Sequence, residues 1–106
     1  MGLPMKSLPL LLALFWAGVG VAAATEYQVP IAGMKFSAPP AELHVDDVIV
    51  WRNDDIFRHT ATARDKSFDI DLPPKSEGRL ILSRAGAVDF YCRFHPAMTG
   101  TLDVRP

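Results

Sequence analysis

The most informative feature of this 106-residue chain is a set of four side chains that can bind a metal ion. Cys92, His95 and Met98 follow one another at intervals of three residues, and Cys92 is the only cysteine. His59 lies upstream, at the start of a β-prone segment. One thiolate, two imidazoles and a weakly bound thioether are the ligands of a type 1 copper centre. Because this mixed set suits both Cu(I) and Cu(II), it favours the transfer of one electron with little rearrangement.

Each of these residues, taken alone, has a simpler explanation. A lone His is usually a surface or hydrogen-bonded core residue, a Met often fills gaps, and a lone Cys can be an inert core residue or half of an intermolecular disulfide. His44 is such a case, because it lies in an alternating segment with no sulfur ligand nearby. The other four residues together favour a metal site. A structural zinc site would fit the number of ligands but not the Met, since Zn²⁺ prefers Cys, His and carboxylate.

The first 24 residues have the features of a secretory signal peptide. Lys6 precedes an uncharged apolar run at 8–21, which is followed by three alanines at 22–24. We therefore predict cleavage after Ala24, export to the periplasm, and no stable membrane insertion of the mature chain. An uncleaved membrane anchor is the alternative, because residues 7–25 carry no charge.

The mature segment, residues 25–106, is long enough for one small domain. It holds 12 acidic residues and all but one of the 11 basic residues, so its formal charge is −2. This balance gives no reason to expect binding to nucleic acid. No arrangement of a nucleophile beside a base is evident, and we expect a monomeric protein that is not an enzyme. Exported domains of this size often need disulfides, yet Cys92 has no partner within the chain, which again favours its use as a metal ligand.

Short β-prone segments separated by turn residues make up the mature segment. They lie at 26–31, 43–45, 48–51, 59–63, 68–72, 79–82, 87–92 and 101–104. The segment 48–51 is apolar on both faces, which predicts a strand inside a sandwich rather than at its edge. About seven or eight such strands predict an all-β Greek-key sandwich or barrel. A strand that ends at Cys92 would place the thiolate at one end of the sandwich, where His59 could arrive from another strand.

The chain resembles the small blue copper proteins, or cupredoxins, over essentially all of the mature segment. The resemblance rests on Val48-Ile49-Val50-Trp51-x-Asn53, on His59, and on Gly86-x-x-x-Phe90-Tyr91-Cys92-x-x-His95-Pro96-x-Met98-x-Gly100. The two residues between His95 and Met98, and the segment 32–36, are similar to those of the amicyanins. The resemblance implies a cupredoxin-like domain with one type 1 copper held by His59, Cys92, His95 and Met98.

The same resemblance implies a periplasmic carrier of single electrons. Its partners would be redox proteins, with a quinoprotein amine dehydrogenase as donor and a c-type cytochrome as acceptor. The edge of His95, surrounded by Met34, Phe57, Pro96 and Ala97, would be the electron port. The alternative is a periplasmic protein that binds or delivers copper without transferring electrons. It predicts further Met and His clusters, whereas the mature segment has only Met34 besides Met98.

Among the departures from the amicyanin pattern, two concern residues next to the histidine ligands. Arg58 occupies the place of a Pro that often precedes the first His ligand, and Phe94 occupies the place of a Pro within the ligand loop. Because proline has no N–H, Phe94 supplies a backbone donor that proline lacks. We expect the amides of Phe94 and Thr60 to donate to the sulfur of Cys92, which would raise the reduction potential.

Overall fold

The computed structural model describes residue 2 and residues 24–106. The predicted signal peptide, residues 1–24, therefore lies almost wholly outside the described residues. Within the described part of the chain, no helix is long and apolar enough to cross a membrane.

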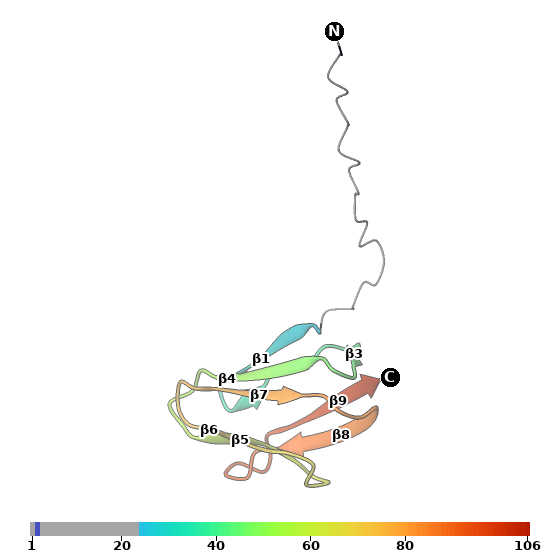
Figure 1. The fold of residues 1–106 in the computed structure, drawn as a ribbon. Coiled ribbons are helices and arrows are strands. Elements are labelled where there is room, and N and C mark those ends of the chain that lie inside the picture. The colour runs from blue at the N-terminus through green and yellow to red at the C-terminus, as the bar shows by residue number, and fades with distance from the viewer. Residues whose placement is uncertain (1, 3–23) are drawn as a thin grey trace.

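The described residues form nine strands in two sheets (Figure 1). In the order of their neighbours, the first sheet consists of β2 (Lys35–Phe36), β1 (Glu26–Ala32), β4 (Val48–Asn53) and β7 (Glu77–Ile81). The second sheet consists of β3 (Leu43–His44), β9 (Thr99–Arg105), β8 (Gly86–Tyr91), β5 (His59–Ala63) and β6 (Asp69–Leu72). The predicted all-β sandwich is confirmed. β2 is a two-residue strand beyond the predicted segments, and the segment predicted at 43–45 forms the two-residue strand β3.

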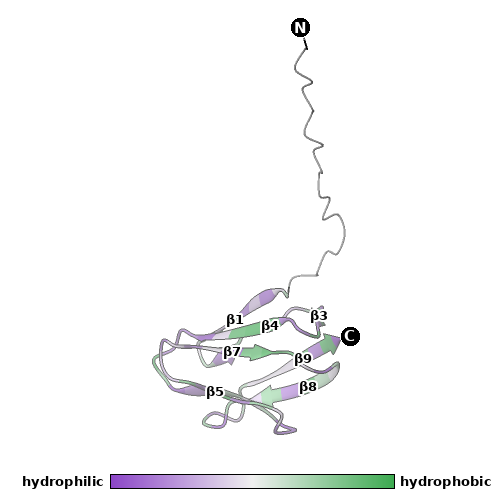
Figure 2. Ribbon diagram, viewed as in Figure 1, coloured by the Kyte–Doolittle hydropathy of each residue, from purple (hydrophilic) through white to green (hydrophobic). Residues whose placement is uncertain are grey.

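Strand β4 lies inside the first sheet, as its apolar sequence predicts. It pairs in parallel with β1 and antiparallel with β7, and its residues Ile49, Val50 and Trp51 are buried. Apolar residues are prominent on β4 and β7 (Figure 2). Because both edges of β4 are paired and its central residues are buried, the strand anchors the first sheet in the core.

Aromatic side chains fill the core between the sheets. The Trp51 ring packs against Phe68 and Phe90, with centroids 5.6 and 5.4 Å apart. Phe90 in β8 pairs with Gly100 in β9, and a Cβ atom at Gly100 would lie 2.3 Å from the Phe90 ring. Glycine is therefore the residue that lets β9 approach Phe90 closely. Since side chains alternate along a strand, Cys92 projects inward two residues beyond Phe90.

Candidate metal centre

The loop between β8 and β9 brings three of the four predicted ligands to one end of the sandwich. Cys92 follows the last residue of β8, and its N–H donates to the carbonyl of Met98 over 3.1 Å. The N–H of His95 donates to the carbonyl of Cys92 over 3.2 Å, and the N–H of Met98 donates to the carbonyl of His95 over 2.8 Å. Two successive turns with hydrogen bonds between residues three apart thus explain the regular spacing of the ligands.

His59 approaches this loop from a neighbouring strand. It is the first residue of β5, which pairs antiparallel with β8 in a register that places Thr62 opposite Tyr91. In that register, the start of β5 extends past the end of β8 and lies alongside the ligand loop. The predicted arrival of His59 from another strand at the same end is what the structure shows.

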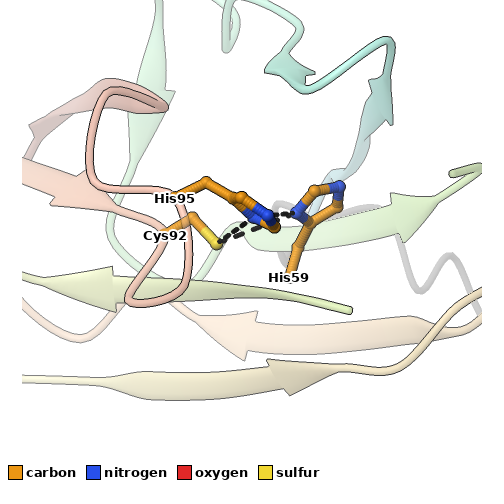
Figure 3. A group of neighbouring side chains, drawn as sticks. All are labelled: His59, Cys92 and His95. Atoms are coloured by element: carbon orange, nitrogen blue, oxygen red, sulfur yellow. Dashed lines mark hydrogen bonds between the residues drawn. The ribbon is translucent and has the colours of Figure 1, made fainter. Parts of the chain in front are cut away.

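The three side chains His59, Cys92 and His95 point toward one another (Figure 3). The two Nδ1 atoms are 3.2 Å apart, and each lies 3.7 Å from the Cys92 sulfur. One ligand atom from each residue falls within 4.8 Å of the others. His59 and Cys92 are fully buried, whereas His95 is partly exposed. A single ion could therefore contact all three side chains while only His95 reaches the surface.

Met98 is buried at the end of the same loop, with 5% of its surface exposed. Beside His95, it lines a surface hollow together with Met34, Phe36 and Ala97. This hollow is mainly apolar, and it lies next to the imidazole that is partly exposed. The placement of Met98 beside His95 is compatible with its predicted role as the fourth ligand, and ligation by all four residues remains a prediction.

Asp55 determines which nitrogen of His59 faces the other ligands. Its Oδ2 lies 2.7 Å from Nε2 of His59, on the side of the ring away from Cys92. Burial alone would raise the pKa of the Asp55 carboxyl, but hydrogen bonds from His59, Met34 and Gly33 lower that pKa below its ordinary value. The ionised carboxylate accepts a hydrogen bond from the N–H at Nε2, so the proton of the ring stays on Nε2. Nδ1 of His59 therefore keeps the lone pair that a metal ion needs.

The donor set fits copper. It combines a buried thiol with two convergent imidazole nitrogens, which are soft and borderline donors, and no carboxylate belongs to the convergent group in the described residues. The second oxygen of Asp55 is engaged as well, because Oδ1 accepts the N–H of Gly33 and Oδ2 also accepts that of Met34. Such outer support holds a histidine ligand in one orientation before the metal arrives.

Asn53 holds the segment that carries Asp55. Its side chain is fully buried, and its Nδ2 donates to the carbonyls of Phe57 and Leu72 over 2.8 and 3.0 Å. Its Oδ1 accepts the N–H of Asp55 over 2.9 Å. This buried amide therefore ties the connection between β4 and β5 to the end of β6, and it keeps Asp55 next to His59.

The hydrogen bonds at the Cys92 sulfur differ in one respect from the expectation. The amide of Thr60 donates to Sγ over 3.4 Å, as expected. The amide of Phe94 is not among the donors to this sulfur in the described structure, so that part of the expectation is wrong. The peptide after Cys92 is instead turned toward β5, since the N–H of Arg93 donates to Oγ1 of Thr60 over 2.9 Å.

Asp55 was not recognised from the sequence as part of the site. Asn53, Asp54 and Asp55 together are typical of a turn that ends a strand, and their pattern indicates no more than that. The signal in the sequence that could have identified Asp55 is its position four residues before His59. His44, which is not among the predicted ligands, lies in β3 opposite Arg105, far along β9 from the ligand loop.

Removal of the Asp55 carboxylate is expected to weaken copper binding. In Asp55→Ala, the His59 ring loses its orienting partner, and loss of such a partner costs about 10- to 100-fold in metal affinity. Competition with a chelator would measure the copper affinity. Asp54→Ala is the matched control, because it removes the same charge from an exposed carboxylate that pairs with Arg52 instead. Equal affinities of the two variants would contradict the role given to Asp55.

Comparison with known proteins supports the fold and the site. No model of a known protein family matches the chain, and no curated protein sequence matches it. Among solved structures, a reduced Cu(I) form of an amicyanin variant with a Pro-to-Gly change, at pH 4, is 27% identical, with 78% of this chain and 83% of that chain covered and a TM-score of 0.63. The reduced state of a Pro-to-Phe variant of amicyanin is 26% identical, with the same coverage and a TM-score of 0.64.

A third solved structure is similar over a slightly larger share of the chain. The Cu(I) form of a Met-to-Ala variant of amicyanin is 25% identical, covers 80% of this chain and 87% of its own, and has a TM-score of 0.65. Together with the convergent His, Cys and His side chains, these similarities confirm the cupredoxin fold and the resemblance to amicyanin that the sequence indicated.

Proposed function

We propose that this protein is a periplasmic type 1 copper protein that carries single electrons between redox partners. The observation that carries the proposal is the convergence of the Cys92 sulfur with the Nδ1 atoms of His59 and His95 at one end of a cupredoxin-like sandwich. One copper per chain, held by these three residues and Met98, would supply a couple between Cu(II) and Cu(I).

The chain's own residues hold the ligand atoms in place. Asp55 keeps the proton of His59 on Nε2, so Nδ1 can bind a metal without reorientation. Thr60 donates its N–H to the sulfur of Cys92, which stabilises the thiolate. The turns of the loop fix His95 and Met98 through backbone hydrogen bonds. A site held in this way before metal binding would keep its geometry when the copper ion changes between Cu(II) and Cu(I). Fast electron exchange requires such a constant geometry.

The partly exposed imidazole of His95 is the proposed electron port. The Phe57 ring lies edge-on to it, with centroids 6.4 Å apart, and 53% of the Phe57 surface is exposed. Ala97 and Met34 line the hollow beside His95, and Pro96 is exposed next to His95. A small apolar surface of this kind favours brief contacts with a redox partner over tight binding.

The resemblance to amicyanin supports redox proteins as partners. We propose a quinoprotein amine dehydrogenase as donor and a c-type cytochrome as acceptor, by extension of that resemblance. The apolar residues around His95 support brief docking with either of them. Location in the periplasm, and cleavage of residues 1–24 as a signal peptide, are further parts of the proposal, which rest on the sequence.

Burial of the ligands is an argument against a copper-delivery protein. Delivery requires ligands that can be reached and exchanged, whereas His59 and Cys92 have no exposed surface and Met98 has 5%. In the described residues, the group of His59, Cys92 and His95 is the one cluster suited to a metal ion. The ligands are therefore arranged to retain the metal rather than to pass it on.

A metal titration combined with redox cycling tests the proposal. With Cu(II), the mature protein is expected to turn intensely blue at one copper per chain, to bleach on addition of ascorbate, and to recover its colour with ferricyanide. Copper content measured after several cycles should stay at one per chain. A colourless complex, or loss of the metal on reduction, would contradict the proposed electron carrier. Zn²⁺ is the control, since it has no redox chemistry.

A further inference from the structure

The first residue of the predicted mature segment, Thr25, is held at both ends of its backbone. Its carbonyl accepts the N–H of Val48 over 2.9 Å, and the next residue, Glu26, pairs with Val48 in the sheet. The backbone nitrogen of Thr25 lies 3.2 Å from Oδ1 of Asp47, to which it donates. The contacts between the start of β1 and the start of β4 therefore extend to the residue at the predicted cleavage point.

Asp47 is a buried carboxylate without a permanent positive partner in the described part of the chain. It is 7% exposed. The one basic side chain paired with it there is that of His44, whose Nδ1 lies 4.0 Å from Oδ2. An imidazole carries a positive charge only when it is protonated. Because acidic side chains are seldom this buried unless they are paired, the surroundings of Asp47 favour a further cation.

The two oxygens of Asp47 have different partners. Oδ2 accepts the N–H of His44 over 2.9 Å, and the N–H of Asp47 donates to the carbonyl of His44 over 3.0 Å. These two bonds hold the turn between β3 and β4, in which Asp46 has a φ of 78°. Oδ1 instead accepts the N–H of Thr25. The turn thus explains the contact at Oδ2 but not the contact at Oδ1.

Removal of the predicted signal peptide changes the charge of the Thr25 nitrogen. A signal peptidase would hydrolyse the peptide bond between Ala24 and Thr25 with one water molecule. The oxygen of that water completes a carboxylate on Ala24, and its two protons convert the amide N–H of Thr25 into an α-ammonium group. An α-amino group has an ordinary pKa of about 7.7–8.0, so it is mainly protonated at neutral pH. The positive charge would therefore appear on the nitrogen that already contacts Asp47.

We propose that Asp47 is a binding site for the α-ammonium group that cleavage creates on Thr25, so that processing itself stabilises the folded domain. The proposal rests on cleavage after Ala24, which is part of the proposed function, and not on the copper site. A hydrogen bond between an ammonium and a carboxylate is about twice as strong as one from a neutral amide. The precursor, in which this nitrogen is uncharged, is then less stable than the mature chain.

The proposed site lies at the end of the sandwich away from the metal centre. β1 begins beside β3 (Figure 1). Beyond the other end of β1, the N–H of Gly33 donates to Asp55, the residue that orients His59. A strand of seven residues spans about 23 Å. The ammonium site and the metal centre can therefore be tested separately.

A double-mutant cycle of folding stability tests the site in the mature protein. One chain begins at Thr25, and a second chain keeps Ala23 and Ala24, which moves the ammonium group two residues away. Both chains are prepared as wild type and as Asp47→Asn, which removes the negative charge at nearly the same size. Chemical denaturation of the copper-free proteins gives their folding equilibrium constants. Because the effect of Asp47→Asn on the turn is present in both chains, it cancels in the cycle.

We expect the two extra residues to lower the folding equilibrium constant about tenfold in the wild type and less than about twofold in Asp47→Asn. Glu26→Gln is the matched control, because Glu26 follows Thr25 directly but pairs with Arg79 at the surface. In that variant, the extra residues should cost the same factor as in the wild type. An equal cost in the wild type and in Asp47→Asn would overturn the proposal.

The reactivity of the terminus is a second readout, which needs no substitution and stays decisive if Asp47→Asn does not fold. An acylating reagent attacks only an unprotonated amine, and mass spectrometry of peptides gives the rate at the α-amino group relative to the exposed Lys66. An ammonium held by a carboxylate is protected. We expect this relative rate to be about tenfold lower in the chain that begins at Thr25 than in the longer chain. Equal rates would contradict the site.

The mass of the protein exported to the periplasm tests the processing step. We expect the mass of residues 25–106. A different first residue would overturn both the predicted cleavage and the ion pair, because the ammonium group would no longer lie at Asp47. Failure of the mature chain to bind copper would instead count against the proposed electron carrier, and the comparison of the two copper-free chains would still decide the ammonium site.

Discussion

Cys92→Ser is expected to abolish the blue colour of the copper-loaded protein completely. The intense absorption of a type 1 site is a charge transfer from thiolate to Cu(II), and a serine hydroxyl cannot supply it. Cys92 is the only cysteine, and its sulfur lies 3.7 Å from both Nδ1 atoms, so no other thiolate can take its place. The visible spectrum after addition of one equivalent of Cu(II) measures the effect.

The copper-free fold of Cys92→Ser should remain close to that of the wild type. Serine is slightly smaller than cysteine, and the amide of Thr60 can donate to its oxygen as it does to sulfur. Far-UV circular dichroism would verify this. His44→Ala provides the control, because it removes an imidazole that lies outside the site, in β3, and should leave the colour intact. A Cys92→Ser protein that stayed blue would refute the ligand assignment.

Among the variants considered, Asn53→Leu is expected to lower the free energy of unfolding the most. Leucine is of similar size, but it cannot donate to the carbonyls of Phe57 and Leu72 or accept the N–H of Asp55. Each buried polar group left without a partner costs about 1–3 kcal/mol, so we expect a loss of about 3 kcal/mol or more in the free energy of unfolding. Such a loss is a large part of the stability of a small domain.

Chemical denaturation of the copper-free protein would measure this loss. Arg52→Ala is a suitable control from the same strand, because Arg52 forms an exposed ion pair with Asp54, and its removal should cost less than about 1 kcal/mol. Since Asn53 also holds Asp55 beside His59, the leucine variant should bind copper more weakly as well. Identical denaturation midpoints for the two variants would show that the amide does not hold this connection.

The local parts of the site were predictable because they depend on neighbouring residues. The spacing of Cys92, His95 and Met98 corresponds to two consecutive turns, which are short-range structures with recognisable sequence patterns. The apolar run at 48–51 predicted an interior strand for the same reason, and β4 is indeed paired along both of its edges. Likewise, the β5 segment predicted at 59–63 coincides with the strand in the structure.

The contacts around the ligands were not predictable because they join residues far apart in the sequence. In the sequence, Asp55 has only the features of a turn residue. In the folded protein, its carboxylate contacts His59 and the backbone N–H groups of Gly33 and Met34. The amide of Phe94 was expected at the Cys92 sulfur, and the direction of the peptide after Cys92 decided otherwise. The direction of a peptide group in a loop depends on the hydrogen-bond partners near it. Which partners are near depends on how distant strands pair.

The order of residues along the chain specifies the types of ligand, their spacing, and the alternation that folds the chain into a sandwich. These properties depend on side-chain chemistry and on periods of two or three residues. The folded arrangement was needed to show which nitrogen of His59 is available, which carboxylate orients it, and which amide reaches the Cys92 sulfur. Each of these depends on the register between strands that are distant in sequence, such as β5 opposite β8 and β6, and that register results from packing of the whole core.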